Sequence, residues 1–279
     1  MKIHKLAFVG SGSIAEAIIA GLIRTHYVEP EQIIVSNRSN KDRLTYFAET
    51  YGVNGTQDKM ELLKEANVVC FAMKPKDVIG AIASIKPFIR EDQLILSLVA
   101  GVDSSSITHL LGKNNPIVRV MPNTSAAILK SATAISPSKH ATQEQLSLAR
   151  ELFETIGMVS IVDEEQMHAV TALSGSGPAY IYYVVEAMEK AAMQIGLSEE
   201  IATPLILQTL LGAADMLKTS AKHPSQLRKE ITSPNGTTEA GVQVLESYNM
   251  QEAFIQCIVQ ATERSHELGE VLNETIEKL

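Results

Sequence analysis

The feature that most constrains this chain is a glycine-rich turn that directly follows a short apolar run. The run Leu6–Val9 has the composition of a buried strand, and a helical pattern with apolar residues at Ile18, Ile19 and Leu22 follows the turn. A G-x-G-x-x-[GA] spacing is weak evidence alone, but between a strand and a helix it predicts a dinucleotide-binding turn. The alternative is a glycine-rich turn without function. The turn consists of Gly10, Ser11, Gly12, Ser13, Ile14 and Ala15.

Three positions of this turn have distinct physical roles. Glycine at position 10 permits a tight turn, and glycine at position 12 lets the backbone approach a pyrophosphate. Ala15 is small enough for the helix to pack closely on the sheet. The N–H groups and the positive dipole end of the helix would bind the phosphate charge.

Short β-rich runs alternate with helical patterns from Lys5 to about Val162. Several runs are apolar without alternation, which is typical of parallel strands buried on both faces, and the intervening segments can hold crossover helices. We therefore expect a Rossmann-type α/β domain, a doubly wound parallel sheet, over residues 1–162. The expected strands are Leu6–Val9, Ile33–Val35, Val68–Ala72, Leu94–Val99 and Ile117–Val120.

Strand patterns end after about Asp163, and long helical patterns follow. A chain of 279 residues also exceeds the roughly 250 residues at which single cores stop growing. We expect a second, all-helical domain over residues 163–279, although Glu164–Ala172 could belong to either domain. The expected helices are Ala179–Ile195, Glu199–Lys218 and Met250–Leu272.

Composition excludes several classes of protein. The formal net charge of −8 and the lack of a basic block argue against nucleic acid as a partner. Cys70 and Cys257 each lie in an apolar stretch, which favours buried thiols over a disulfide or a metal site. No stretch is apolar enough to span a membrane, and Met1 leads into a strand pattern without a signal-peptide pattern. We expect a cytoplasmic protein without metal.

The end of the second expected strand indicates which dinucleotide is bound. NAD enzymes usually carry a carboxylate there for the ribose hydroxyls, whereas this strand ends in Ser36-Asn37-Arg38. The Arg38 guanidinium could pair with a 2′-phosphate, and Ser36 and Asn37 could donate further hydrogen bonds. We expect NADP(H) to be preferred, with NAD(H) as a second candidate. The alternative for Arg38 is a solvated surface side chain.

Further cofactor contacts are expected where other strands end, because parallel strands present their carboxyl ends at one crevice. Lys74 is expected at the rim rather than as a proton donor, and Asn123 is the best polar contact in its loop. The residues expected in the crevice are Ala72, Met73, Lys74, Pro75, Ala100 and Asn123.

Two segments of the helical part are candidates for binding a substrate. Leu173–Pro178 packs small residues, among them Ser176 and Gly177, before a helix, and a structural helix start explains it equally well. Ser233–Thr238 precedes another helical pattern, so its N–H and hydroxyl groups could bind a carboxylate; ordinary capping is the alternative. The second set comprises Ser233, Asn235, Gly236, Thr237 and Thr238.

Five motifs in this order resemble those of pyrroline-5-carboxylate reductases, and they extend over nearly the whole chain. They are Gly10–Ala15, Ala72–Pro75, Arg119–Thr124, Leu173–Tyr180, and Ser233–Thr238 with Gly241. The resemblance implies NADPH-dependent reduction of 1-pyrroline-5-carboxylate to L-proline, the last step of proline biosynthesis. It also implies a helical dimerisation domain, a homodimer and larger rings of dimers such as a decamer.

The resemblance also implies roles for single residues. The loop Ser233–Thr238 would hold the substrate carboxylate, and the Thr238 hydroxyl would reach the ring nitrogen as the catalytic contact. Ser125 and Asn235 depart from the commoner Pro and Gly of the family. A cyclic imine is readily protonated in water, so no strong acid is required. Thr238 of one chain would complete the crevice of its partner.

Two other functions remain open from the sequence. A related NADP-dependent reductase could act on another cyclic imine or on a hydroxyacid, but a β-hydroxyacid dehydrogenase should carry a Lys and an Asn where Tyr180, Tyr183 and Ala187 stand. A non-catalytic NADPH-binding regulatory protein would keep the first motif and lose the donors at Ser233–Thr238. Apolar residues beyond one helical stripe, including Leu207 and Leu211, favour a homodimer.

Overall fold

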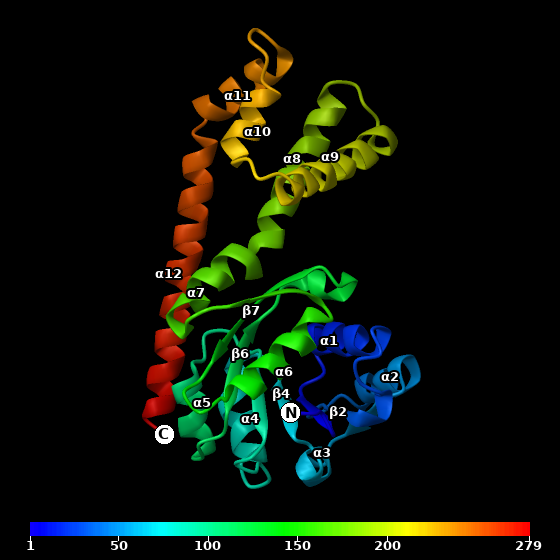
Figure 1. Ribbon diagram of the computed structural model, residues 1–279, viewed down its shortest axis with the longest axis vertical. Helices are drawn as coiled ribbons and strands as arrows, with labels where there is room; N and C mark the ends of the chain where they lie inside the picture. Colours follow the sequence, from blue (N-terminus) through cyan, green and yellow to red (C-terminus); the bar gives the residue numbers. More distant parts are fainter. The chain divides into compact units, whose positions relative to one another are not determined.

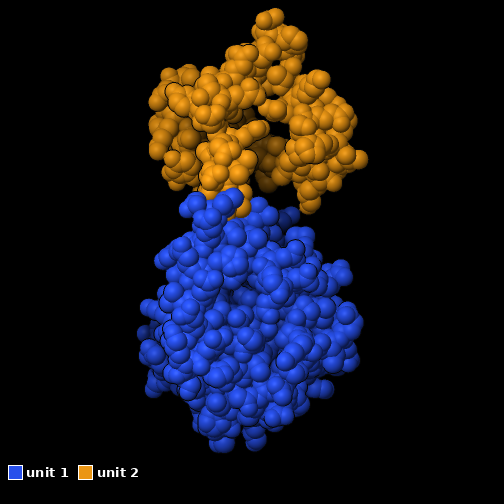
Figure 2. All heavy atoms as spheres, turned by 90° about the vertical axis from the view of Figure 1, so that its left-hand side faces the viewer, with its two compact units in different colours: residues 1–178, 259–279 blue, residues 179–258 orange.

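The computed structural model describes all 279 residues and consists of two compact units (Figure 2). Unit 1 comprises residues 1–178 and 259–279, and unit 2 comprises residues 179–258. The last helix, Met250–Glu277, therefore contributes its residues from Val259 onward to unit 1. The expected functional boundary between residues 162 and 163 stays a prediction.

An eight-stranded sheet forms the centre of unit 1, in the order β3-β2-β1-β4-β5-β6-β7-β8. All neighbouring strands are parallel except β6 and β7, which pair antiparallel. This confirms the expected doubly wound α/β fold and adds two strands, β7 and β8, that run opposite to the other six. The strands are β1 (Leu6–Val9), β2 (Ile33–Ser36), β3 (Asn54–Thr56), β4 (Val68–Phe71), β5 (Leu94–Ser97), β6 (Ile117–Met121), β7 (Ser131–Pro137) and β8 (Gly157–Ile161).

The five expected strands are present, and three further strands were not predicted. β3 has only three residues, of which Asn54 and Gly55 are exposed, so it lacks an apolar pattern. β7 consists mostly of small residues, and β8 is largely exposed at the edge of the sheet. These strands form because a neighbouring strand supplies hydrogen bonds, which local sequence does not reveal.

Both faces of the sheet are covered by helices, as the apolar strands predicted (Figure 1). Alternate residues of β1 belong to different cores: Phe8 packs with Ile18 and Phe153, whereas Val9 packs with Ile82 and Ile107. Ile276, in the last helix, is fully buried in the second core. The helices before the boundary are α1 (Ser13–Arg24), α2 (Lys41–Tyr51), α3 (Lys59–Lys64), α4 (Val78–Ile85), α5 (Ser104–Leu111), α6 (Gln143–Glu154) and α7 (Met167–Val170).

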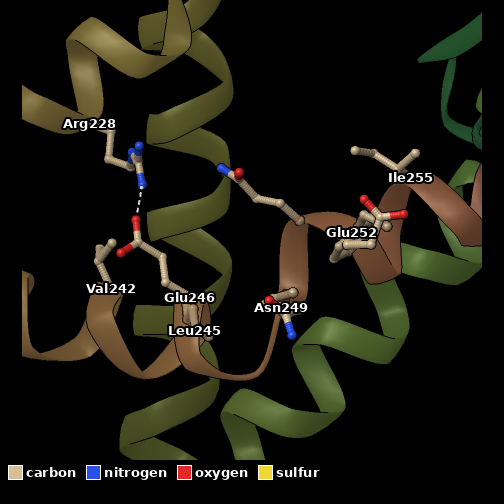
Figure 3. A pocket seen from close by; sticks show the side chains of 10 residues that line it. Arg228, Val242, Leu245, Glu246, Asn249, Glu252 and Ile255 are labelled. Atoms are coloured by element: carbon tan, nitrogen blue, oxygen red, sulfur yellow. Dashed lines mark hydrogen bonds and ion pairs between the residues drawn. The ribbon is translucent and has the colours of Figure 1, made fainter.

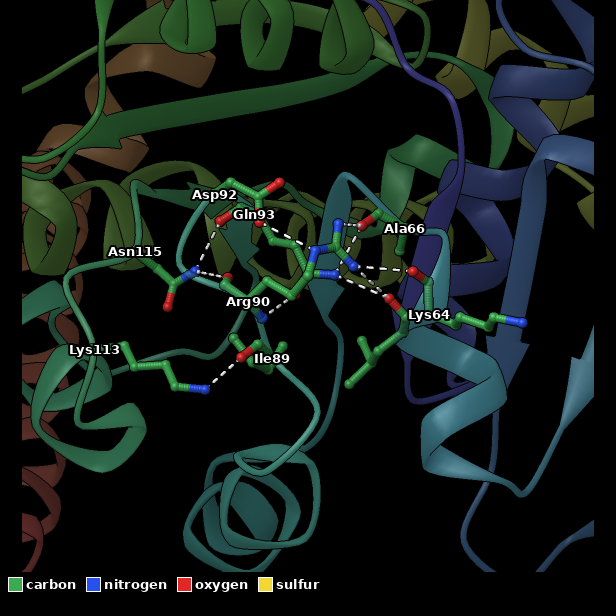
Figure 4. Close-up of polar contacts among 9 residues, drawn as sticks. Lys64, Ala66, Ile89, Arg90, Asp92, Gln93, Lys113 and Asn115 are labelled. Carbon is green, nitrogen blue, oxygen red and sulfur yellow. Dashed lines mark hydrogen bonds and ion pairs between the residues drawn. The ribbon is translucent and has the colours of Figure 1, made fainter.

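A polar network joins the loops before β4, β5 and β6, away from the strand ends that concern function (Figure 4). The Arg90 guanidinium donates hydrogen bonds of 3.2, 3.0 and 2.9 Å to the carbonyl oxygens of Leu63, Lys64 and Ala66. The buried Gln93 amide donates to two of the same carbonyl oxygens, those of Leu63 and Ala66, and the buried Asn115 amide donates to those of Arg90 and Gln93. This network satisfies buried carbonyl groups and has a structural role.

Residues 164–175 form three short helical pieces instead of the single helix expected over Glu164–Ala172. A 3-10 turn over Glu164–Gln166 precedes α7, and a π-helix over Thr171–Gly175 follows it. Single-turn π-helices are rare and occur frequently at functional sites.

Unit 2 is entirely helical, which confirms the expectation for this part of the chain. Its helices bury very little: only Ala192, Ala202 and Ile206 form a core cluster of buried residues. None of the helices in the chain has the length and apolar character needed to cross a membrane. The helices are α8 (Gly177–Gln194), α9 (Glu199–Thr219), α10 (Pro224–Glu230), α11 (Thr237–Ser247) and α12 (Met250–Glu277).

Candidate active site

The glycine-rich turn links β1 to α1 at the carboxyl edge of the sheet. Gly10 has a φ of +116°, and a Cβ there would lie 2.6 Å from the carbonyl oxygen of Ala72. At Gly12 a Cβ would meet no atom within 4 Å, and no side chain caps the helix. Gly10 is thus required by the fold, whereas Gly12 leaves an open backbone cradle at the positive end of α1. This cradle fits a pyrophosphate group.

The three residues at the end of β2 differ in whether their side chains are free. The Ser36 hydroxyl donates to the Phe8 carbonyl oxygen at 3.1 Å, inside the sheet. The Asn37 amide donates to the Ser11 hydroxyl at 2.6 Å and stabilises the glycine-rich turn. The Arg38 guanidinium is exposed and has no hydrogen bond or ion pair. Of the three, Arg38 has donors available to a ligand.

A cavity of about 390 Å³ lies at these strand ends. It brings together several residues expected from the sequence: Gly10, Ser36, Asn37, Arg38 and Met73. It also contains residues that sequence reasoning missed: Val9, Ser39, Lys59, Asp77, Gly80, Ala81 and Ser84. Recognition of the short polar strand β3 would have pointed to Lys59, which follows it at the same edge.

Several other expected cofactor residues do not line this cavity. Ser11 and Ala15 are buried and support the glycine-rich turn from within. The Ala72 N–H donates to the Val9 carbonyl oxygen at 3.0 Å, and Pro75 begins a short 3-10 helix. The remaining residues lie on the same turn or on neighbouring strand ends: Gly12, Ser13, Ile14, Lys74 and Ala100.

Asn123, at the end of β6, ties this edge to the π-helix. Its Nδ2 donates to the Ser174 carbonyl oxygen at 3.1 Å, and its Oδ1 accepts from the Ser125 N–H at 3.1 Å. The small segment that follows, with Ser176 and Gly177, is half-buried at the start of α8. Asn123 therefore positions the residues that lead to Ser176.

An ion pair supports the strand that carries Asn123. Arg119 on β6 is 4% exposed in its side chain, and its Nη1 lies 3.1 Å from Oε1 of Glu164. Glu164 also accepts hydrogen bonds from the N–H and hydroxyl of Ser104, at 2.7 and 2.5 Å. A buried guanidinium requires such a counter-charge.

His168 and His223, considered as acids, have structural contacts. The His168 ring stacks on His266 with a centroid separation of 4.0 Å and bonds the Ser265 hydroxyl at 2.9 Å. Burial lowers the pKa of His168, and the charges of His266 and Arg119 lower it further. His223 caps α10 by accepting a hydrogen bond from Ser225.

A second cation near the turn is neutralised by a carboxylate. Arg43 donates from Nε to the Ser11 carbonyl oxygen at 3.0 Å and forms an ion pair with Glu16. Burial raises the pKa of Glu16, but hydrogen bonds from Arg43, Tyr46 and Tyr51 outweigh it and hold the pKa below its usual range. Arg43 is therefore not free to bind an anion.

In unit 2, the loop Ser233–Thr238 presents unused donors at the start of α11. Asn235 has a φ of +58°, which confirms that it takes the left-handed conformation usual for glycine. Gly236 is the N-cap, and no side chain caps the helix. The hydroxyls of Ser233, Thr237 and Thr238 make no hydrogen bond. These donors can bind a carboxylate.

Unit 2 also exposes an apolar surface that its own residues do not cover. Tyr183, Leu207 and Leu211 are 75%, 49% and 60% exposed, which confirms the apolar surplus. Two cavities of about 780 Å³ lie between its helices, one of them beside the Arg228–Glu246 ion pair (Figure 3). Such a surface is a liability on a monomer.

Comparisons with known proteins agree with these features. Residues 164–268 match a family model described as pyrroline-5-carboxylate reductase dimerisation, and residues 5–101 match one described as NADP oxidoreductase, coenzyme F420-dependent. Pyrroline-5-carboxylate reductase 2 of Bacillus subtilis is 49% identical over 266 residues, with 95% of each chain covered. Pyrroline-5-carboxylate reductase of Staphylococcus aureus is 38% identical over 267 residues, covering 96% of this chain and 98% of the relative.

Solved structures give the same result. A pyrroline-5-carboxylate reductase from Coxiella burnetii has a TM-score of 0.87 and 40% identity, covering 95% of this chain and 98% of that chain. The Plasmodium falciparum pyrroline carboxylate reductase, solved with NADP bound, has a TM-score of 0.88 and 28% identity, covering 96% and 99%. The chain belongs to the pyrroline-5-carboxylate reductase family.

Proposed function

We propose that this chain reduces 1-pyrroline-5-carboxylate to L-proline with NADPH bound at the carboxyl edge of the sheet and the substrate carboxylate bound at the start of α11. The chain is an oxidoreductase, and its cofactor is NADP(H). The observation that carries the cofactor assignment is the open cradle at Gly12 beside a cavity lined by the unpaired Arg38.

NADPH supplies a hydride for the imine carbon. The backbone at Gly12 and the first N–H groups of α1 hold the pyrophosphate, because the space beside Gly12 is open and these groups lie at the positive end of the helix. Arg38 binds the 2′-phosphate, since its guanidinium fork has no competing partner. Met73 lines the same crevice through its half-buried side chain.

The substrate is held by the loop before α11. Backbone N–H groups of Thr237 and Thr238, with the Ser233 hydroxyl, bind the carboxylate, and the Thr238 hydroxyl hydrogen-bonds the ring nitrogen. The Gly236 N–H donates to the Ser233 carbonyl oxygen at 3.0 Å and closes the loop. The free hydroxyls and the uncapped helix start support this assignment. Asn235 sets the turn through its left-handed conformation, and its N–H donates to Glu239 at 2.8 Å. The small residues Ser176 and Gly177 leave space for the substrate ring.

The imine nitrogen takes its proton from water, so the chain contributes orientation more than acid strength. This agrees with the structural roles of His168 and His223. Thr238 stabilises the protonated ring in the geometry that accepts the hydride.

The chain associates with itself, since the family model for its helical part is a dimerisation domain and unit 2 exposes apolar surface. We further propose a homodimer that assembles into a ring of dimers such as a decamer, located in the cytoplasm. Sedimentation at several protein concentrations tests the assembly.

A coupled assay of NADPH oxidation with racemic pyrroline-5-carboxylate tests the activity. We expect turnover with one enantiomer and a lower Michaelis constant for NADPH than for NADH. Turnover of the six-membered cyclic imine should be slower. Faster turnover with the larger imine would instead identify a reductase of another cyclic imine. NADPH binding without turnover on any imine or hydroxyacid would indicate a regulatory protein.

A further inference from the structure

The cofactor cavity contains a second cation besides Arg38. Lys59, the first residue of α3, lines the cavity together with Arg38 and Ser39. Its side chain is half-buried, and it makes no ion pair or hydrogen bond. A half-buried lysine packs its apolar stem against the protein and keeps its ammonium accessible, so the Lys59 ammonium is available to bind an anion.

A cross-link between two loops places Lys59 beside Arg38. The side-chain amide of Gln57 donates to the carbonyl oxygens of Asn37 and Arg38, at 3.3 and 3.1 Å. Two residues later α3 begins, and Asp58 fixes its start by accepting from two backbone N–H groups at 2.8 and 3.1 Å. The loop after β3 is thereby tied to the loop after β2, which carries Arg38.

Nearby carboxylates do not neutralise these two cations. Glu61, on the same helix as Lys59, accepts a hydrogen bond from the Thr56 hydroxyl. Asp77 lines the cavity but forms no ion pair with Arg38 or Lys59. The cavity is therefore lined by two cations and one carboxylate that is paired with neither, and this excess of positive charge favours a phosphate group.

We propose that Lys59 and Arg38 together bind the 2′-phosphate of NADPH, and that Gln57 is a positioning residue for the pair. The assignment rests on the proposed cofactor site at Arg38. A phosphomonoester carries up to two negative charges near neutral pH, which matches one guanidinium and one ammonium. NADH has a hydroxyl at this position, so Lys59 contributes to the choice between the two cofactors.

The test measures binding to the full-length protein by fluorescence titration with NADPH and NADH, and by competition with 2′-AMP and 5′-AMP. We expect Lys59→Met to weaken the binding of NADPH and 2′-AMP at least about tenfold. The affinities for NADH and 5′-AMP should change less than about twofold. Lys59→Arg should retain most of the preference. Lys64→Met is the matched control, because Lys64 is exposed at the other end of the same helix.

Gln57→Leu tests the positioning role. It should reduce the preference for NADPH more in the wild-type background than in the Lys59→Met background, since only Arg38 is left to be positioned in the latter. Equal losses in both backgrounds would show that Gln57 has only a general structural role.

Two outcomes distinguish failure of this inference from failure of the proposed function. If Arg38→Ala reduces the preference for NADPH and Lys59→Met does not, Lys59 is not part of the phosphate site and the proposed function stands. If neither substitution changes the preference, the phosphate site itself is misplaced. An equal loss of affinity for NADPH and NADH in the Lys59→Met protein would also overturn the inference.

Discussion

The two glycines that begin the first motif should respond to alanine in opposite ways. Gly12 has an ordinary φ of −75° and open space where a Cβ would lie. Gly10 has a φ of +116°, and its Cβ would lie 2.6 Å from a backbone oxygen of Ala72. We therefore expect Gly12→Ala mainly to weaken cofactor binding and Gly10→Ala mainly to lower the free energy of unfolding.

The structure gives the magnitudes. Alanine is a poorer N-cap than glycine, so Gly12→Ala should cost roughly 1 kcal/mol of stability or less. Its methyl group occupies the space in which a pyrophosphate oxygen would approach, and we expect NADPH to bind at least about tenfold more weakly, or about 1.4 kcal/mol. Gly10→Ala adds backbone strain of about 1–3 kcal/mol before the steric conflict is counted.

Urea unfolding and NADPH fluorescence titration on the same two proteins separate the effects. Loss of NADPH affinity with an almost unchanged unfolding midpoint is expected for Gly12→Ala. The reasoning is wrong if Gly12→Ala binds NADPH like the wild type, or if Gly10→Ala is as stable as the wild type.

Thr238→Ala should raise the activation barrier by about 1–3 kcal/mol, and so lower turnover, while NADPH affinity is retained. Near-normal turnover at saturating substrate would contradict the catalytic role of Thr238. Inactive Arg38→Glu and Thr238→Ala chains, mixed under conditions of subunit exchange, should regain activity if the site is shared; no recovery after proven exchange refutes sharing. Glu164→Gln should reduce the free energy of unfolding by about 3 kcal/mol, because it leaves the Arg119 guanidinium, 4% exposed in its side chain, without a counter-charge, whereas the exposed Glu165→Gln should have little effect. Because the pKa of His168 is lowered on folding, the native state binds fewer protons than the unfolded state, and stability should fall as the pH drops below about 6.5. This pH dependence should be weaker in His168→Gln, as measured by urea unfolding at pH 7.5 and 5.5.

Local sequence was sufficient to predict the central sheet and the cofactor-binding part of the proposed site. Apolar strands such as Leu6–Val9 and Val68–Phe71 carry their burial in their own composition, because a strand covered on both faces needs no polar positions. The glycine motif and Arg38 follow from their position after such strands, and the structure places both at one cavity. The donors of Ser233–Thr238 were also visible, since they directly precede a helix.

Which polar groups remain free to bind a ligand depends on contacts that form when the chain folds. Ser36 and Asn37 had the same apparent role as Arg38 in the sequence, but hydrogen bonds across the sheet engage the first two. Lys59 lies 21 residues from Arg38 in the sequence, and a hydrogen bond from the Gln57 side chain to the Arg38 carbonyl oxygen joins their two loops. Such pairings depend on contacts between distant segments, and no pattern within a single segment specifies them.

The same distinction applies to the larger architecture. The residue pattern was sufficient to predict a parallel sheet followed by helices, because hydrophobic periodicity is a local property. The antiparallel entry of β7, the π-helix held by Asn123, and the packing of Ile276 in the core of unit 1 were decided by the tertiary structure. Each depends on a partner that the chain supplies only after it has folded, and the hydrogen bonds and burial that stabilise these features exist only in that state.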